Sequence, residues 1–206
     1  MDLKAMFNLS YGLFVLTATD GAKDNGCITN TCIQVTSEPN QIAFAVNKAN
    51  YTHDMVFKTR EFNISIISED ASFDLFKHFG FQSGRDMDKF KDFTAFDRAA
   101  NGIPYIVSGT NAYISGKVVS ALDIGTHTLF IAKVTDMNVL SQIPSATYTY
   151  YQGNIKPKPQ PAAAPAGKTV WRCTVCGYEY EGEELPADFI CPLCKHPASD
   201  FEKVTV

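Results

Sequence analysis

Two cysteine pairs in this chain have the spacing of metal ligands. Cys173 and Cys176 form one C-x-x-C pair, and Cys191 and Cys194 form a second. Four thiolates grouped in this way favour tetrahedral coordination, which suits zinc or a single iron ion. The surrounding segment, about 38 residues long, is too short to fold on a hydrophobic core alone, and a bound metal can supply the missing stability. The spacing predicts a metal site and leaves zinc and iron both open.

The residues around these cysteines resemble rubredoxin. The resemblance rests on "CTVCGYEYEG", on "CPLC" and on the later Phe201. It implies one iron ion held by the four thiolates, with a zinc ribbon used for interaction as the alternative. Gly177 is expected to take positive φ so that the turn closes. The aromatic side chains expected to shield the metal are Trp171, Tyr178, Tyr180 and Phe189.

A second group of polar residues lies far upstream, in the stretch "NKANYTH". Within seven residues it offers hydrogen-bond donors just before a short helical pattern, at Asn47, Lys48, Asn50, Thr52 and His53. The first amides of a helix are suited to an anion such as a phosphate. A solvated polar turn is the alternative interpretation of the same stretch.

The elements that must position these residues are mostly strands. Short runs rich in β-branched and aromatic residues alternate with Gly, Asn, Asp and Pro, which favours antiparallel pairing in a barrel or sandwich. The expected strands are 13–19, 27–37, 41–47, 62–68, 104–108, 111–125 and 126–140, the last two as a hairpin. Two short helices are expected at 52–59 and 72–80, the second with Ser72 as N-cap and Gly80 as its stop. The polar run 83–92 is interpreted as a solvated loop or helix face.

Several of these pieces resemble the flavin reductase-like, FMN-binding split-barrel family. They are residues 28–67, "GTHTLFIAKV" at 125–134 and "YTYYQG" at 148–153. The resemblance implies a mainly β fold, an antiparallel split barrel with a few short helices. It also implies FMN as the cofactor and NADH as the substrate. The residues implied for the flavin are Thr29, Asn30, Thr31, Cys32, Asn47, Lys48, Asn50, Thr52, His53 and Tyr151.

The same resemblance implies a catalytic position for His127, near the nicotinamide or the flavin. The family commonly has Asp before this histidine, and Thr126 stands there in this chain. An acid-assisted role for His127 is therefore not expected, and a structural role is the alternative. Cys27 and Cys32 flank the flavin segment and are interpreted as small apolar side chains rather than a redox disulfide.

A stretch rich in Pro and Ala, "KPKPQPAAAPAGK", divides the chain. This composition favours extended polyproline II and cannot build a core. The expected domains are a split barrel at 1–153, a linker at 154–168 and a rubredoxin-like domain at 169–206. The linker should act as a semi-rigid tether.

The whole chain resembles the high-molecular-weight rubredoxins of anaerobic bacteria. NADH gives up two electrons as a hydride, whereas iron with four protein thiolates accepts one electron and has no position for substrate. A flavin joins the two chemistries. The resemblance implies a homodimer that passes electrons to a flavodiiron protein, which reduces nitric oxide or dioxygen. The alternatives are a reductase that supplies free reduced flavin to a monooxygenase, and a non-enzymatic flavin-binding protein with structural zinc.

Charge and hydropathy exclude some partners. The net charge is −4 and the pI about 5.5, so nothing favours nucleic acid or an anionic membrane surface as a partner. No apolar run approaches the roughly 20 residues needed to cross a bilayer. We therefore expect a cytoplasmic protein, in which C-x-x-C pairs indicate metal or redox chemistry.

Overall fold

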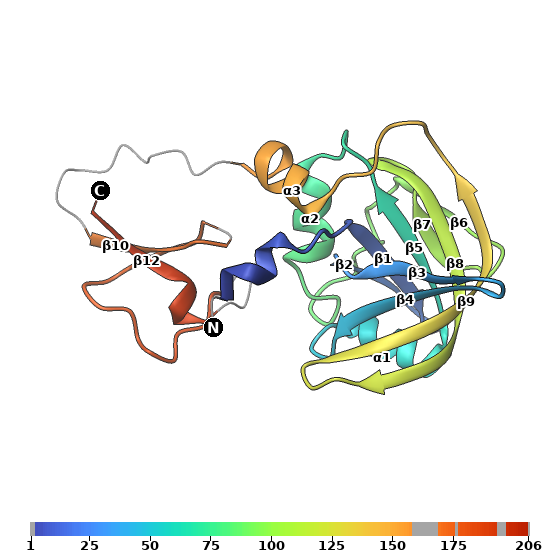
Figure 1. Cartoon of the computed structure of the whole chain (residues 1–206), viewed down its shortest axis with the longest axis horizontal. Coiled ribbons are helices and arrows are strands. Elements are labelled where there is room, and N and C mark those ends of the chain that lie inside the picture. The colour runs from blue at the N-terminus through green and yellow to red at the C-terminus, as the bar shows by residue number, and fades with distance from the viewer. Residues whose placement is uncertain (1–2, 158–168, 176, 193–196, 206) are drawn as a thin grey trace. The chain divides into compact units, whose positions relative to one another are not determined.

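The computed structural model describes residues 3–157, 169–175, 177–192 and 197–205. The chain divides into two compact units, Met1–Lys156 and Pro157–Val206 (Figure 1). Within the described ranges, none of the helices is long and apolar enough to span a membrane.

Seven strands of the larger unit form one antiparallel sheet in the order β2-β1-β5-β8-β9-β4-β3. Their bounds are β1 Phe14–Thr19, β2 Asp24–Thr29, β3 Cys32–Ser37, β4 Asn40–Asn47, β5 Glu61–Ile67, β8 Thr110–Asp123 and β9 His127–Val139. Two short strands, β6 (Phe96–Arg98) and β7 (Pro104–Ile106), pair beside it. The expected hairpin is confirmed, because β8 and β9 pair antiparallel.

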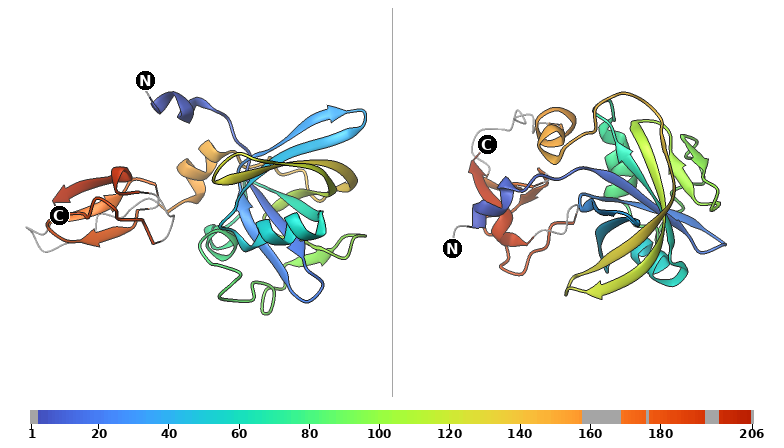
Figure 2. Two further views of the ribbon diagram at one scale, coloured as in Figure 1. Left: turned by 90° about the horizontal axis from the view of Figure 1, so that it is seen from below. Right: turned by 45° about the vertical axis from the view of Figure 1, so that its right-hand side comes forward.

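The order of the strands curls the sheet into a barrel. Its two edge strands, β2 and β3, follow each other in the chain and are joined by Asn30 and Thr31 alone. Such a short connection must bring the two edges together, and the strands curve around a common interior in Figure 2. The expected strand at 27–37 is therefore two strands, divided where the barrel closes.

The barrel interior is filled by apolar side chains that alternate with exposed ones along the strands. On β9, Thr128, Phe130 and Ala132 are buried between more exposed neighbours, as expected for a strand with one face on the core. The Phe44 ring lies 4.5 Å from that of Phe62 and 5.3 Å from that of Phe130, measured between centroids. Helix α1 (Tyr51–Thr59) adds buried side chains to the same cluster.

A second apolar cluster covers the outside of β1 and β5. It contains the buried face of α2 (Phe73–Gly80), the loop after it and the helical segment at the end of the unit. That segment is α3 (Tyr148–Tyr150), which continues as a π-helical turn (Tyr151–Ile155). Gly80 is the last residue of α2 rather than a left-handed stop. A Cβ on Gly80 would lie 3.2 Å from Ile28, so the glycine serves close packing.

The smaller unit is a three-stranded antiparallel sheet in the order β11-β10-β12. The strands are β10 Thr169–Cys173, β11 Glu179–Glu181 and β12 Phe201–Thr205. Cys173, Cys191 and Phe201 form its buried cluster, with aromatic neighbours packed around them, and Val170 is buried as well. The expected aromatic core is confirmed, since Trp171, Tyr178, Tyr180 and Phe189 all belong to it.

Candidate functional site

The turn between β4 and α1 meets the β8–β9 hairpin at one end of the barrel. Asn47 is the register partner of His127, and the Lys48 amide donates to the carbonyl oxygen of Thr126 over 3.0 Å. The Lys48 ammonium lies 2.6 Å from the Asp123 carboxylate. The fold thereby brings together predicted site residues that are about 80 positions apart in the chain.

The segment 29–31 lies against the same strand, two residues before Asn47. The hydroxyls of Thr29 and Thr31 both donate to the carbonyl oxygen of Ala45, over 3.2 and 3.0 Å. Cys32 follows at the start of β3, paired with Phe44 and partly buried. Burial raises the pKa of the Cys32 thiol to about 12. Four predicted flavin residues, Thr29 to Cys32, therefore border the closing seam of the barrel.

Thr52 and His53 turn inward rather than toward solvent. Thr52 is fully buried and its hydroxyl accepts a hydrogen bond from Asn25. His53 Nε2 lies 2.8 Å from the Thr128 hydroxyl, and its ring stacks on Phe57. In this structure both side chains join α1 to the barrel. A part for them in flavin binding stays a prediction.

Tyr151 belongs to a different part of the larger unit. Its ring packs 4.4 Å from that of Phe76 and 6.4 Å from that of Phe73, both on α2. It is a member of the second cluster, whereas the turn 47–50 borders the first. The structure does not bring Tyr151 into the group formed by 29–32, 47–50 and His127.

The group at the β4–α1 turn has donors suited to a phosphate. Asn50 is the N-cap of α1 and its side chain makes no capping hydrogen bond, although the His53 amide donates to the Asn50 carbonyl oxygen over 3.0 Å. No side chain therefore caps the first turn of the helix. Asn47 accepts from the Ala49 amide, which shapes the turn. His127 is half-buried beside it, with Nδ1 2.8 Å from the Thr126 hydroxyl. This donor set fits a flavin phosphate.

A strap of residues 83–89 packs beside α1, and sequence reasoning missed it. Lys89, expected in solvent, is 2% exposed, and its ammonium donates to the carbonyl oxygens of Gly26 and Phe79 over 2.8 and 3.0 Å. Lys23 donates to the carbonyl oxygens of Gly84 and Met87. Burial lowers the pKa of Lys89 to about 8. Every residue has a backbone carbonyl, so no residue type in the sequence predicts these contacts.

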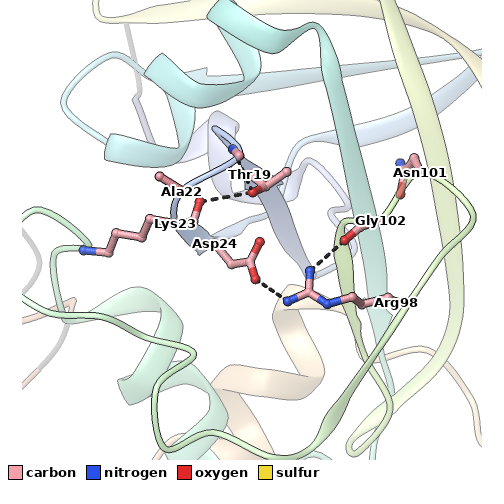
Figure 3. Close-up of a pocket in the computed structure, with 8 residues that line it drawn as sticks. Thr19, Ala22, Lys23, Asp24, Arg98, Asn101 and Gly102 are labelled. Atoms are coloured by element: carbon pink, nitrogen blue, oxygen red, sulfur yellow. Dashed lines mark hydrogen bonds and ion pairs between the residues drawn. The ribbon is translucent and has the colours of Figure 1, made fainter.

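A polar cavity lies beside the turn that joins β1 and β2 (Figure 3). Its volume is ≈ 370 Å³, and it lies between the β1–β2 turn and the turn at 98–102. The Arg98 guanidinium is 2.6 Å from the Asp24 carboxylate and also donates to the carbonyl oxygen of Gly102. Because its charged groups already satisfy one another, the cavity offers little to a charged ligand.

Two of the four predicted metal ligands lie in the described part of the smaller unit. Cys173 and Cys191 are 1% and 0% exposed and belong to one cluster. Cys176 and Cys194 lie outside the described residues. In the described ranges, no group of three or more His, Cys, Asp or Glu is placed to hold a metal.

The turn after Cys173 has the shape expected for a metal-binding knuckle. Gly177 has φ +76°, which confirms the positive φ predicted for it, and its amide donates to the carbonyl oxygen of Cys173 over 2.9 Å. The Cys173 amide donates in turn to the carbonyl oxygen of Tyr178. Two buried cysteines in an aromatic shell, one of them at the start of a tight turn, fit one metal ion with thiolate ligands.

Family models match both units. The flavin reductase like domain matches residues 6–158, and the rubrerythrin, rubredoxin-like domain matches residues 171–202. The first implies a bound flavin and the second implies iron. Among solved structures, the NADH:FAD oxidoreductase SgcE6 of Streptomyces globisporus has a TM-score of 0.64 and 18% identity, and the match covers 70% of this chain and 84% of that one. This likeness supports the fold.

Two curated relatives are similar over most of their length. A ferric-chelate reductase (NAD(P)H) of Archaeoglobus fulgidus is 35% identical, over 73% of this chain and 89% of the relative. The high molecular weight rubredoxin of Moorella thermoacetica is 36% identical, over 99% of this chain and 100% of the relative. The chain therefore belongs to the flavin reductase like family, in the form that carries a C-terminal rubredoxin-like domain, as high molecular weight rubredoxin does.

Proposed function

We propose that this protein takes electrons from NADH through FMN to an iron ion in its own smaller unit, and passes them singly to another protein. The observation that supports this proposal is the presence of both modules in one chain. The NAD(P)H named for the Archaeoglobus relative supports a nicotinamide donor. A flavin accepts a hydride and releases electrons one at a time, which the iron requires.

The chain's own residues are proposed to bind and position the two groups. The turn Asn47–Asn50 and the first amides of α1 would hold the flavin phosphate. Thr29 to Cys32 would border the ring, and His127 would contact the nicotinamide or the flavin. The iron would be held by Cys173, Cys176, Cys191 and Cys194. The segment 154–168 would act as the linker that keeps the iron domain near the flavin, at millimolar effective concentration for a short tether.

The acceptor proposed is a flavodiiron protein that reduces nitric oxide or dioxygen. The smaller unit's charge supports a protein acceptor with a basic patch. Residues 168–206 carry four basic and seven acidic side chains, a net charge of −3. Opposite charges raise the rate of a transient encounter more than its affinity.

A homodimer is proposed from the apolar side chains that the larger unit exposes. They lie on β3, β8 and β9 and on the turn between the last two strands: Ile33, Val35, Val119, Leu122, Ile124, Met137 and Val139. Exposed apolar side chains in such number are typical of an interface.

Cys27 and Cys32 are thiols in the structure, which supports the reducing cytoplasm as the compartment.

Two other functions remain as competing hypotheses. A reductase that releases reduced flavin to a monooxygenase would lose its flavin during gel filtration, whereas an electron-transfer protein would retain it. A binding protein with a structural zinc ribbon would contain zinc and show no ferric thiolate absorption. Metal analysis and a visible spectrum of the purified protein separate these cases.

The test of the proposed function is an anaerobic titration with NADH followed by absorbance. We expect both the flavin and the ferric thiolate bands to bleach. In Cys191→Ser the flavin band should still bleach. Reduction of an external one-electron acceptor protein should fall by at least about 100-fold, which corresponds to about 2.7 kcal/mol of activation free energy. Wild-type rates in Cys191→Ser would place the iron off the electron path and refute the proposal.

A further inference from the structure

Arg85 is held beside the first turn of α1 by two contacts. Its guanidinium carbon lies 5.1 Å from the centroid of the Tyr51 ring, and Tyr51 is the first residue of the helix. Nη2 lies 2.6 Å from the Asp54 carboxylate, one turn further along. Arg85 therefore reaches the same end of α1 as the turn Asn47–Asn50, although it is more than 30 residues away in the chain.

The guanidinium keeps donors available. A guanidinium has five N–H donors, and among the contacts of the described residues the Arg85 side chain uses only Nη2, toward Asp54. Half of the side chain, 49%, is exposed. Lys23, the other cation near Tyr51, is committed to the carbonyl oxygens of Gly84 and Met87. Arg85 is thus the cation of this cluster with spare donors.

The strap gives Arg85 a defined position. Lys23 and Lys89 tie the strap to the β1–β2 hairpin from both sides of Arg85. Gly84 lies so close to Asn25 that a Cβ there would be 2.1 Å from the amide oxygen. An arginine on an anchored backbone loses less conformational entropy on binding than one on a free loop.

We propose that Arg85 is a binding residue that recognises a phosphate group of the nucleotide held at this end of α1. This inference rests on the proposed function and deepens it, because it assigns the phosphate contact to the strap as well as to the helix. Arginine suits a phosphate through its planar, bidentate donors. The phosphate belongs either to FMN or to the nicotinamide dinucleotide, and measurements of FMN binding and of the KM for NADH distinguish the two sources.

Substitution of Asp54 distinguishes a binding role of Arg85 from a purely structural one, because the two roles predict opposite changes in phosphate affinity. If Arg85 only latches the strap to α1, Asp54→Asn and Arg85→Gln break the same pair and should have the same effect. If Arg85 binds phosphate, Asp54 competes for it. Asp54→Asn should then tighten phosphate binding by about 2- to 5-fold, the range of an exposed ion pair, while Arg85→Gln weakens it.

The first experiment measures binding to the flavin-free full-length protein by quenching of flavin fluorescence, with FMN and with riboflavin, which has no phosphate. For Arg85→Gln we expect the Kd for FMN to rise about 10- to 100-fold, the range for a hydrogen bond to a charged group. The Kd for riboflavin should not change, which also shows that the variant is folded. Arg85→Lys should lie between wild type and Arg85→Gln.

Arg98→Gln is the matched control. Arg98 is also 49% exposed and pairs at 2.6 Å with a carboxylate, that of Asp24 at the start of β2. Its variant should bind FMN as the wild type does. The second arm measures the KM for NADH and NADPH in each variant. A higher KM in Arg85→Gln with unchanged FMN binding assigns the phosphate to the nicotinamide dinucleotide.

Three results overturn the inference: unchanged FMN binding and unchanged KM in Arg85→Gln, equal losses for FMN and riboflavin, or losses of the same sign in Arg85→Gln and Asp54→Asn. These three results can be distinguished from a failure of the proposed function. If the wild-type protein binds neither flavin, the proposed function falls and takes this inference with it.

Discussion

The two units of this protein are stabilised in different ways. The larger unit buries two apolar clusters, and Phe44, Phe62 and Phe130 are at most 1% exposed. The buried cluster of the smaller unit consists of Cys173, Cys191 and Phe201, and two of these three are predicted metal ligands. Hydrophobic burial can therefore hold the barrel folded without its cofactor, whereas the smaller unit should depend on its metal.

The largest effect is expected from removal of the metal. Treatment with a chelator under reducing conditions, or Cys173→Ser, should unfold the smaller unit and leave the larger one intact, because a sheet of three short strands buries too little apolar area alone. In 15N–1H NMR spectra the dispersed signals of residues 169–205 should collapse while those of the barrel persist. Persistence of both sets of signals would show that the units do not differ in this way.

A smaller effect is expected from a cavity in the barrel. Phe130 is fully buried, so Phe130→Ala should lower the free energy of unfolding of the larger unit by about 3–5 kcal/mol. The visible spectrum of the metal site should not change. Val107→Ala is the control, since Val107 is 44% exposed and its truncation should cost less than about 0.5 kcal/mol. Urea unfolding followed by the NMR signals of the barrel measures both.

The smallest effect concerns Lys89 and pH. Burial lowers the pKa of Lys89 to about 8 in the folded barrel, from 10.5. Between these values the unfolded chain binds the proton and the folded chain does not, so the contribution of Lys89 to stability rises with pH. The rise is at most about 1.4 kcal/mol per pH unit.

Lys89→Met isolates this contribution from other titrating groups. The difference in unfolding free energy between wild type and Lys89→Met should grow from pH 8 to pH 10, measured by urea unfolding. A difference that stays constant or shrinks over this range would show that the ammonium form is the one that the barrel prefers.

Much of the fold could be predicted from local patterns. Runs of β-branched and aromatic residues between turn residues indicated most of the barrel strands, and the α1 and α2 segments were expected within one residue of their observed bounds. The division of 27–37 at Asn30 was not predicted, because both halves have the same β-branched composition and only closure of the barrel requires a break. Lys89 was misjudged because its partners are carbonyl oxygens.

The candidate site was predicted in part. Residues 29–32 and His127 came from the family resemblance, and the turn 47–50 came also from its polar donors before a short helix. Their roles stay predictions, but their proximity is a property of the fold. Tyr151 came from the same resemblance and packs in the second cluster. Arg85 lay in a run that looked like any solvated loop. What identifies it is the contact with Tyr51 and Asp54 across more than 30 residues.

The sequence by itself determined the features that are local. The cysteine spacing, the strand and helix periodicity and the Pro- and Ala-rich division all follow from neighbouring residues, since metal coordination and backbone preference act over a few positions. Only the tertiary structure decided which loops meet at the end of the barrel. Closure of the sheet between β2 and β3 sets those distances, and it depends on the register of every strand together.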